Sequence, residues 1–204
     1  MARAEDDLLS KEPDFVIIEF SVNDESTEHF METYEGLVRK VYTSKTKPAV
    51  LLVHNVFYNN GGNAQLMHGR IARHYDLPAV SMQSTIYPEV VSGHIENRDI
   101  TPDDLHPNDA GHALVASVIT YFLDKVRTED VKELSEPDYP APLTKNTYEK
   151  SIRHQNNDEK AVCSGFVADT SAQRDITDCF KHGWTASKKG DSITFDIEAV
   201  MFRC

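Results

Sequence analysis

The sequence predicts an α/β protein built on a parallel sheet, followed by a smaller β-rich region. Over the first 127 residues, short apolar segments alternate with longer segments whose apolar residues recur at the helical period. After residue 150, short alternating runs bounded by turn residues replace this pattern. We therefore expect a flavodoxin-like three-layer α/β/α domain over residues 1–127, a linker over 128–150 and a small sandwich-like β-rich domain over 151–204.

Three segments have the composition of buried strands. The first, Asp14–Phe20, is rich in β-branched and aromatic residues and follows Pro13. The second and third, Ala49–Val53 and Pro78–Met82, are also short and apolar. Near-continuous apolarity is typical of strands that are covered on both faces, as in a parallel sheet between two layers of helices.

Three helices are expected around these strands. The longest covers Asp109–Val126, and Asn108 stands where its N-cap should be. Another runs through Leu66–Tyr75. The first helix follows the first strand, and its apolar stripe consists of Met31, Tyr34, Leu37, Val38, Val41 and Tyr42.

The C-terminal third of the chain differs in composition. Residues 128–150 are acidic and contain three prolines, which predicts a linker or an extended segment that crosses a surface. Beyond it, short strands are expected in Ala161–Val167, in the region 180–185 and in Ser192–Ile197.

The charge balance argues against several classes of function. The 204 residues include 33 acidic and 21 basic side chains, for a net charge of −12, which repels phosphate backbones and anionic lipids. We therefore expect neither nucleic-acid nor membrane partners. The N-terminal residues lack the apolar core of a signal peptide, so a cytoplasmic location is the default expectation. Cys163, Cys179 and Cys204 have unrelated spacings and favour free thiols over a disulfide framework or a zinc site.

Two polar segments follow predicted strands, where ligands bind in open α/β sheets. Ser21–Asp24 comes directly after the first strand, and the side-chain amide of Asn23 is suited to stabilise a developing oxyanion. The same residue types are common in ordinary turns and helix N-caps. The sequence around Asn23 is compatible with both roles.

The second segment, Asp103–Pro107, precedes the longest helix. An aspartate three residues before a histidine can hold one ring nitrogen, which leaves the other nitrogen free to act as a general base. Asp103 and His106 therefore form a candidate catalytic pair. The alternative is a surface aspartate–histidine pair at the start of the helix.

Taken together, these segments resemble a known family. Glu19–Asp24 and Asp103–His112 are similar to the third and fifth sequence blocks of the SGNH (GDSL-type) hydrolases, and Tyr34–Lys40 and Tyr75–Pro78 are similar to the segments between those blocks. The resemblance spans about residues 5–126.

The resemblance implies a serine esterase without a metal or organic cofactor. Its substrate would be a small ester or an acetylated carbohydrate. By position in the blocks, Asn23 would be the oxyanion-hole donor, His106 the general base and Asp103 the residue that orients His106. Ser21 stands where the third block has a glycine, which is a change between small residues.

The first two blocks of the family, which supply the nucleophilic serine and a glycine, have no counterpart before Asp14–Phe20. We therefore expect an N-terminally incomplete domain that lacks the first strand and has little esterase activity. Asp14–Phe20 would then form a sheet edge, which predicts self-association. The alternative function is a non-catalytic remnant that binds carbohydrate or a protein partner.

The chain does contain one Gly-Asp-Ser segment, Gly190–Ser192. A circular permutation would let Ser192 act as the nucleophile, because catalytic triads are defined by geometry and not by chain order. However, no buried apolar run precedes Gly190, and an alternating strand follows Asp191. The sequence therefore favours a hairpin turn, and this stretch also looks like the small β-domain that follows SGNH domains in some bacterial proteins.

Overall fold

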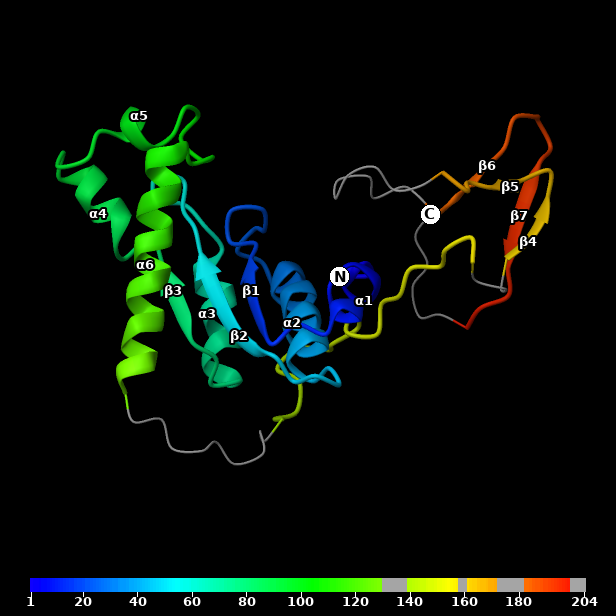
Figure 1. Ribbon diagram of the computed structural model, residues 1–204, viewed down its shortest axis with the longest axis horizontal. Coiled ribbons are helices and arrows are strands. Elements are labelled where there is room, and N and C mark those ends of the chain that lie inside the picture. Colours follow the sequence, from blue (N-terminus) through cyan, green and yellow to red (C-terminus); the bar gives the residue numbers. More distant parts are fainter. Residues whose placement is uncertain (130–138, 158–160, 172–181, 199–204) are drawn as a thin grey trace. The chain divides into compact units, whose positions relative to one another are not determined.

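The computed structural model describes residues 1–129, 139–157, 161–171 and 182–198. The chain divides into two compact units, Met1–Ser151 and Ile152–Cys204. The first unit is mixed α/β and the second is β-rich (Figure 1), which confirms the predicted order of the two regions.

The first unit contains a three-stranded parallel sheet in the order β1-β2-β3. All three predicted strands are present, and in the register of the sheet Phe15 lies beside Ala49 and Leu52 beside Ala79. The central strand is buried on both faces, as its uniform apolarity predicts. The bounds are β1 Phe15–Glu19, β2 Ala49–His54 and β3 Ala79–Ser81.

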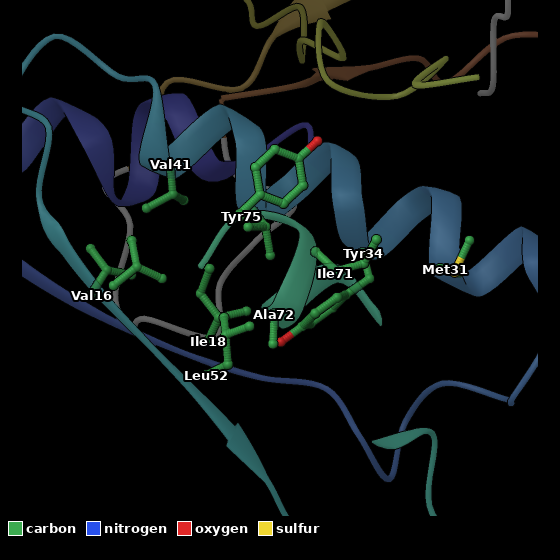
Figure 2. Close-up of a cluster of buried hydrophobic side chains, with 11 residues drawn as sticks. Val16, Ile18, Met31, Tyr34, Val41, Leu52, Ile71, Ala72 and Tyr75 are labelled. Atoms are coloured by element: carbon green, nitrogen blue, oxygen red, sulfur yellow. The ribbon is translucent and has the colours of Figure 1, made fainter. Parts of the chain in front are cut away.

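Two helices, α2 (Glu28–Tyr42) and α3 (Gln65–His74), cover one face of the sheet. Their apolar stripes and the inward side chains of β1 and β2 form one core cluster (Figure 2). The hydroxyl of Thr27 caps α2 by accepting a hydrogen bond from the amide of Phe30. The buried members of this core cluster are Val16, Ile18, Met31, Tyr34, Val38, Val41, Val50, Leu52, Ile71, Ala72 and Tyr75.

Helix α6 (Asp109–Thr128) covers the opposite face. The side chain of Asn108 accepts a hydrogen bond from the amide of Gly111 at 3.0 Å, which confirms the predicted N-cap. Helices therefore lie on both sides of the parallel sheet. The α6 side chains that pack on the second core cluster, around Leu51, Val53 and Met82, are Leu114, Val115, Val118, Ile119 and Phe122.

Four short helices were not predicted from the sequence. Each has six residues or fewer, which is too short to show a helical period. They are α1 (Ala4–Asp7), the 3-10 helix Leu9–Lys11, α4 (Ile86–Val91) and α5 (Asn97–Ile100).

One face of β1 is left uncovered. Among the described residues, β1 pairs with β2 alone. Phe15 and Ile17 are 42% and 45% exposed, although Leu51, the neighbour of Ile17 in register, is fully buried. β1 therefore forms an apolar sheet edge in the described part of the chain.

Residues 139–151 run along α2 and belong to the first unit. The carboxylate of Glu35, fully buried on α2, accepts hydrogen bonds from the amides of Leu143 at 2.6 Å and Thr144 at 2.8 Å. The hydroxyls of Thr144 and Tyr75 also donate to it. Residues 139–151 therefore form a crossing segment that is held by a buried acid. Residues 130–138 of the expected linker lie outside the described residues.

Burial by itself raises the pKa of Glu35, but the hydrogen bonds from Thr144, Tyr75 and Leu143 outweigh burial and leave the pKa below its ordinary value.

A second charged side chain of α2, Arg39, also holds the crossing segment. Arg39 donates to Glu149 at 2.8 Å and to the carbonyl of Pro140 at 2.9 Å. The crossing segment is thus held on α2 through two charged side chains.

The second unit contains two antiparallel pairs, β4-β7 and β5-β6. The strand predicted over Ala161–Val167 is interrupted at Gly165, whose φ of +83° ends the extended conformation. Part of the strand expected in the region 180–185 lies outside the described residues. The bounds are β4 Ala161–Ser164, β5 Val167–Ala168, β6 Trp184–Thr185 and β7 Ser192–Phe195.

The Gly-Asp-Ser segment lies in a turn, as predicted, but the turn does not close a hairpin, because β6 pairs with β5 and β7 pairs with β4. The carboxylate of Asp191 accepts hydrogen bonds from the amides of Lys188 at 3.0 Å and Ser187 at 3.3 Å. Gly190 has a φ of +101°, and Ser192 is the first residue of β7. The aspartate of the segment is therefore used to close a turn.

Candidate functional site

Both candidate segments lie at the carboxyl ends of the strands. The turn Ser21–Asp24 follows β1, and the loop that contains Asp103 and His106 precedes α6 at the same end of the sheet (Figure 1). This is the edge at which open α/β sheets bind ligands.

The turn after β1 presents Asn23 to solvent. The amides of Asn23 and Asp24 both donate to the carbonyl of Phe20, at 3.1 and 3.0 Å. Within the described residues, no hydrogen bond engages the side-chain amide of Asn23, and Asn23 is exposed. This amide is therefore available to a ligand.

Ser21 anchors the turn to the neighbouring strand. Its fully buried hydroxyl lies 2.9 Å from both Glu19 Oε1 and the carbonyl of Asn55. Its own carbonyl accepts a hydrogen bond from the amide of Ala64 at 2.7 Å. A small side chain fits this enclosed position, and its hydroxyl satisfies polar groups that would otherwise be buried unpaired.

Behind the turn lies a buried polar cluster that the sequence did not predict. Asp24 Oδ2 lies 3.0 Å from His68 Nε2, and the His68 ring stacks on Tyr34 with centroids 3.6 Å apart. His54 is buried beside them, and burial together with the nearby His68 lowers the pKa of His54 to about 4. His54 and His68 are thus core histidines, and the described residues contain no group of three side chains suited to hold a metal.

The second segment contains the expected carboxylate–imidazole pair. Asp103 Oδ2 lies 2.6 Å from His106 Nδ1, while Asp103 Oδ1 accepts hydrogen bonds from the amides of His106 at 2.8 Å and Leu105 at 3.1 Å. The hydrogen bonds from His106, side chain first and then backbone, hold the pKa of Asp103 well below its ordinary value. Asp103 therefore stays ionised beside the ring.

The outer nitrogen of the ring is open. The His106 side chain is 75% exposed, and Nε2 makes no hydrogen bond to any described residue. With Nδ1 directed at a carboxylate, Nε2 is the nitrogen that can accept a proton. Among the described residues, no serine, threonine or cysteine forms a hydrogen bond with the His106 ring.

One loop links the two segments. The β2–α3 loop, residues 55–64, contacts the Asn23 turn through Asn55 and Ala64. At its other side, the amide of Tyr58 donates to the carbonyl of Asp104 at 2.8 Å. The Ser21–Asp24 turn and the loop that contains Asp103 and His106, called the base loop below, are thus both held by the same connecting loop.

The sequence predicted the pairing of Asp103 with His106 but missed the residues that support it. The carboxylate of Asp104 accepts a hydrogen bond from Asn97 and forms an ion pair with Arg98, both on α5. No periodicity marks a four-residue helix, so its side chains gave no signal. The repeated acid at 103–104 was the available signal, because Asp is tolerated in turns that need an unusual backbone.

The chain is thus an α/β protein with an aspartate–histidine pair and an exposed side-chain amide at the carboxyl edge of its parallel sheet. The chain is 91% identical, with a TM-score of 0.88, to a crystal structure of a two-domain esterase (CEX) active on acetylated mannans. It is 90% identical, with a TM-score of 0.86, to a structure of such an esterase co-crystallised with mannopentaose.

These similarities cover 97% of this chain but only 53% and 52% of the two esterase chains. The chain thus spans about half the length of the esterases that it resembles. No family model matches the chain, and neither does any curated protein. In the described residues, no helix is long and apolar enough to cross a membrane.

Proposed function

We propose that this chain contributes the base and the oxyanion donor of an SGNH-type serine esterase that deacetylates carbohydrate, with acetylated mannan as the substrate class. The observation that carries the proposal is the 2.6 Å contact between Asp103 and His106, which leaves Nε2 open at the carboxyl edge of the sheet. The similarity to esterases active on acetylated mannans supports this substrate class.

In the proposed reaction, His106 Nε2 removes the proton from a serine hydroxyl as the serine oxygen attacks the acetyl carbon. Asp103 holds the ring in the required tautomer and stabilises the imidazolium that forms. The amide of Asn23 donates to the carbonyl oxygen as it becomes negative. The imidazolium then protonates the leaving sugar oxygen, and water attacks the acetyl-enzyme to release acetate.

None of the described residues is assigned as the nucleophilic serine in this proposal. Ser192 is a poor candidate because it is the first residue of a paired strand and Asp191 is used by a turn. A base and an oxyanion donor without a nucleophile give at most about 10³–10⁴-fold acceleration over water. We therefore expect the 204-residue chain to release acetate slowly.

The test is acetate release from acetylated mannan, with p-nitrophenyl acetate as a second substrate. His106→Ala and Asn23→Ala should each reduce the rate of the wild-type chain, because each removes one of the two remaining groups. Ser192→Ala should leave the rate unchanged. Rapid turnover that Ser192→Ala abolishes would instead establish the permuted arrangement, and turnover unaffected by His106→Ala would defeat the site assignment.

The second candidate is a non-catalytic carbohydrate-binding protein, favoured because no serine, threonine or cysteine of the described residues forms a hydrogen bond with the His106 ring. It predicts that mannopentaose binds the wild-type chain and the His106→Ala variant equally, with no acetate release from either. Isothermal titration calorimetry on both proteins measures the binding, and the acetate assay on the wild-type chain separates this candidate from the first proposal.

We also propose that the chain self-associates through β1. The exposed apolar side chains of Phe15 and Ile17 lie on a strand that, among the described residues, pairs only with β2, so its other edge can pair with a further strand. Ile17→Lys should reduce the mass seen by size-exclusion chromatography with light scattering. Leu66→Lys, which replaces an exposed apolar residue on α3, is the control. A monomeric wild-type chain would contradict this proposal.

A further inference from the structure

The residue that follows Asp103 has an unusual backbone conformation. Asp104 has a φ of +73°, in the left-handed region that residues with a Cβ rarely adopt. Because the chain reverses direction there, the amides of Leu105 and His106 both point back to Asp103 Oδ1. Oδ2 is then left for the His106 ring. The geometry of the aspartate–histidine pair therefore depends on the conformation of Asp104.

Several contacts hold Asp104 in place. Its Oδ1 accepts a hydrogen bond from Asn97 Nδ2 at 2.6 Å and lies 2.9 Å from the guanidinium of Arg98. Its Oδ2 lies 3.4 Å from Asn59 Nδ2, and its carbonyl accepts from the amide of Tyr58. The carboxylate is thus fixed mainly by α5 and the backbone by the β2–α3 loop.

We propose that Asp104 is a positioning residue, which locks the base loop so that Asp103 holds His106 with Nε2 directed outward. The inference rests on the proposed function, because that function requires a proton acceptor at Nε2. A glycine would adopt the same φ without strain but would lose every side-chain contact. Aspartate tolerates the left-handed region and also anchors the loop to α5.

Asn97 is the main anchor in this arrangement. Its Nδ2 contact is the shortest that Asp104 makes, and its Oδ1 is enclosed. The Arg98 side chain is 61% exposed, and an ion pair with so much solvent access contributes little. The anchor that decides the loop geometry is therefore a neutral amide on a four-residue helix.

Three variants of the full chain separate backbone conformation from anchoring. Asp104→Gly keeps the left-handed backbone and removes the anchor. Asp104→Asn keeps both a tolerated backbone and a side-chain oxygen that can accept from Asn97. Asn97→Ala removes the anchor and leaves Asp104 intact. Asp76→Gly is the matched control, because Asp76 also has a positive φ, +49°, but lies in the turn between α3 and β3.

The readouts are the NMR titration of the Asp103 carboxyl carbon and the ¹⁵N shifts of the His106 ring, which report the tautomer. In the wild-type chain we expect the Asp103 pKa below its ordinary 3.8 and a proton on Nδ1. Asp104→Gly and Asn97→Ala should raise the Asp103 pKa by about one unit and mix the tautomers. Asp104→Asn should show a smaller change, and Asp76→Gly none.

The proposal is overturned if Asp104→Gly and Asn97→Ala are both folded, as cooperative unfolding transitions would show, and both retain the wild-type Asp103 titration and His106 tautomer. If Asp104→Gly does not fold, the Asp103 titration and the His106 tautomer of Asn97→Ala alone test the proposal. An effect of Asp76→Gly equal to that of Asp104→Gly would also overturn it. None of these measurements needs turnover, so a wild-type chain that releases no acetate would defeat the proposed function and leave this test intact.

Discussion

Replacing Glu35 with alanine is expected to lower the free energy of unfolding of the first unit by about 2–4 kcal/mol. Glu35 is fully buried and accepts four hydrogen bonds, three of them from residues 143 and 144 of the crossing segment. Without the carboxylate, these donors lose their acceptor, and the crossing segment loses its main attachment to α2. Chemical denaturation followed by circular dichroism at pH 7 measures the effect.

Glu32→Ala is the matched control for this prediction. Glu32 lies on the same helix and accepts from the amide of Thr147 in the same segment, at 3.0 Å, but the contact is exposed. We expect a loss of less than about 0.5 kcal/mol. Equal losses for Glu32→Ala and Glu35→Ala would show that the buried carboxylate has no special role.

The contribution of Glu35 should also depend on pH. Hydrogen bonds hold its pKa in the folded protein below the ordinary value of 4.5. The stabilisation is therefore present above pH 4.5 and is lost as the pH falls through the lower, folded-state pKa. The stability difference between the wild-type chain and Glu35→Gln should shrink as the pH is lowered from 5 toward 3. A difference that does not change over that range would contradict the assignment.

Gly111→Ala is expected to destabilise the chain by about 2–3 kcal/mol and to disturb the base loop. A Cβ at position 111 would lie 2.2 Å from the carbonyl oxygen of Ile100 and 2.9 Å from Pro107 Cβ. The nearest atom belongs to the backbone and cannot rotate away, so α6 or α5 must shift. Because Pro107 follows His106, the shift should also change the ring signals of His106 in NMR spectra.

The control for this substitution is Gly69→Ala on α3. A Cβ there would meet only the flexible guanidinium of Arg73, at 3.4 Å. Alanine has the higher helix propensity by up to about 1 kcal/mol, so we expect equal or greater stability. Thermal unfolding of both variants distinguishes close backbone approach from a general cost of losing glycine. A stable Gly111→Ala variant with unchanged His106 signals would contradict the packing described at this helix start.

Regular elements of the α/β unit could be predicted because their signal is local. The apolar run of β2 and the apolar stripe of α2 indicate which faces of these elements are buried, and Asn108 indicates where α6 begins. The short helices α4 and α5 carry no such signal, since a period needs more residues than they contain. Their positions follow from packing against α6 and the neighbouring loops.

In the candidate site, too, contacts between residues close in the sequence could be predicted and contacts between distant residues could not. The spacing of Asp103 and His106 was sufficient to predict their contact, because three residues of loop bring a carboxylate and a ring together. The sequence offered no means to predict that Asp24 would contact His68, which lies 44 residues away on another element. Nor did it show that Asp104 would be held by Asn97.

By itself, the sequence predicted the parallel α/β order and the β-rich region that follows, and its resemblance to known sequence blocks made Asn23 and His106 candidate site residues. Burial patterns and short-range spacing indicate the helices, the strands and the contact between Asp103 and His106, because each of these signals lies within a short segment of the sequence. Only the tertiary structure decided that a buried acid on α2 holds residues 139–151 and that α5 anchors the base loop. Those contacts join distant segments, and their energy depends on desolvation and geometry that arise only after the chain has folded.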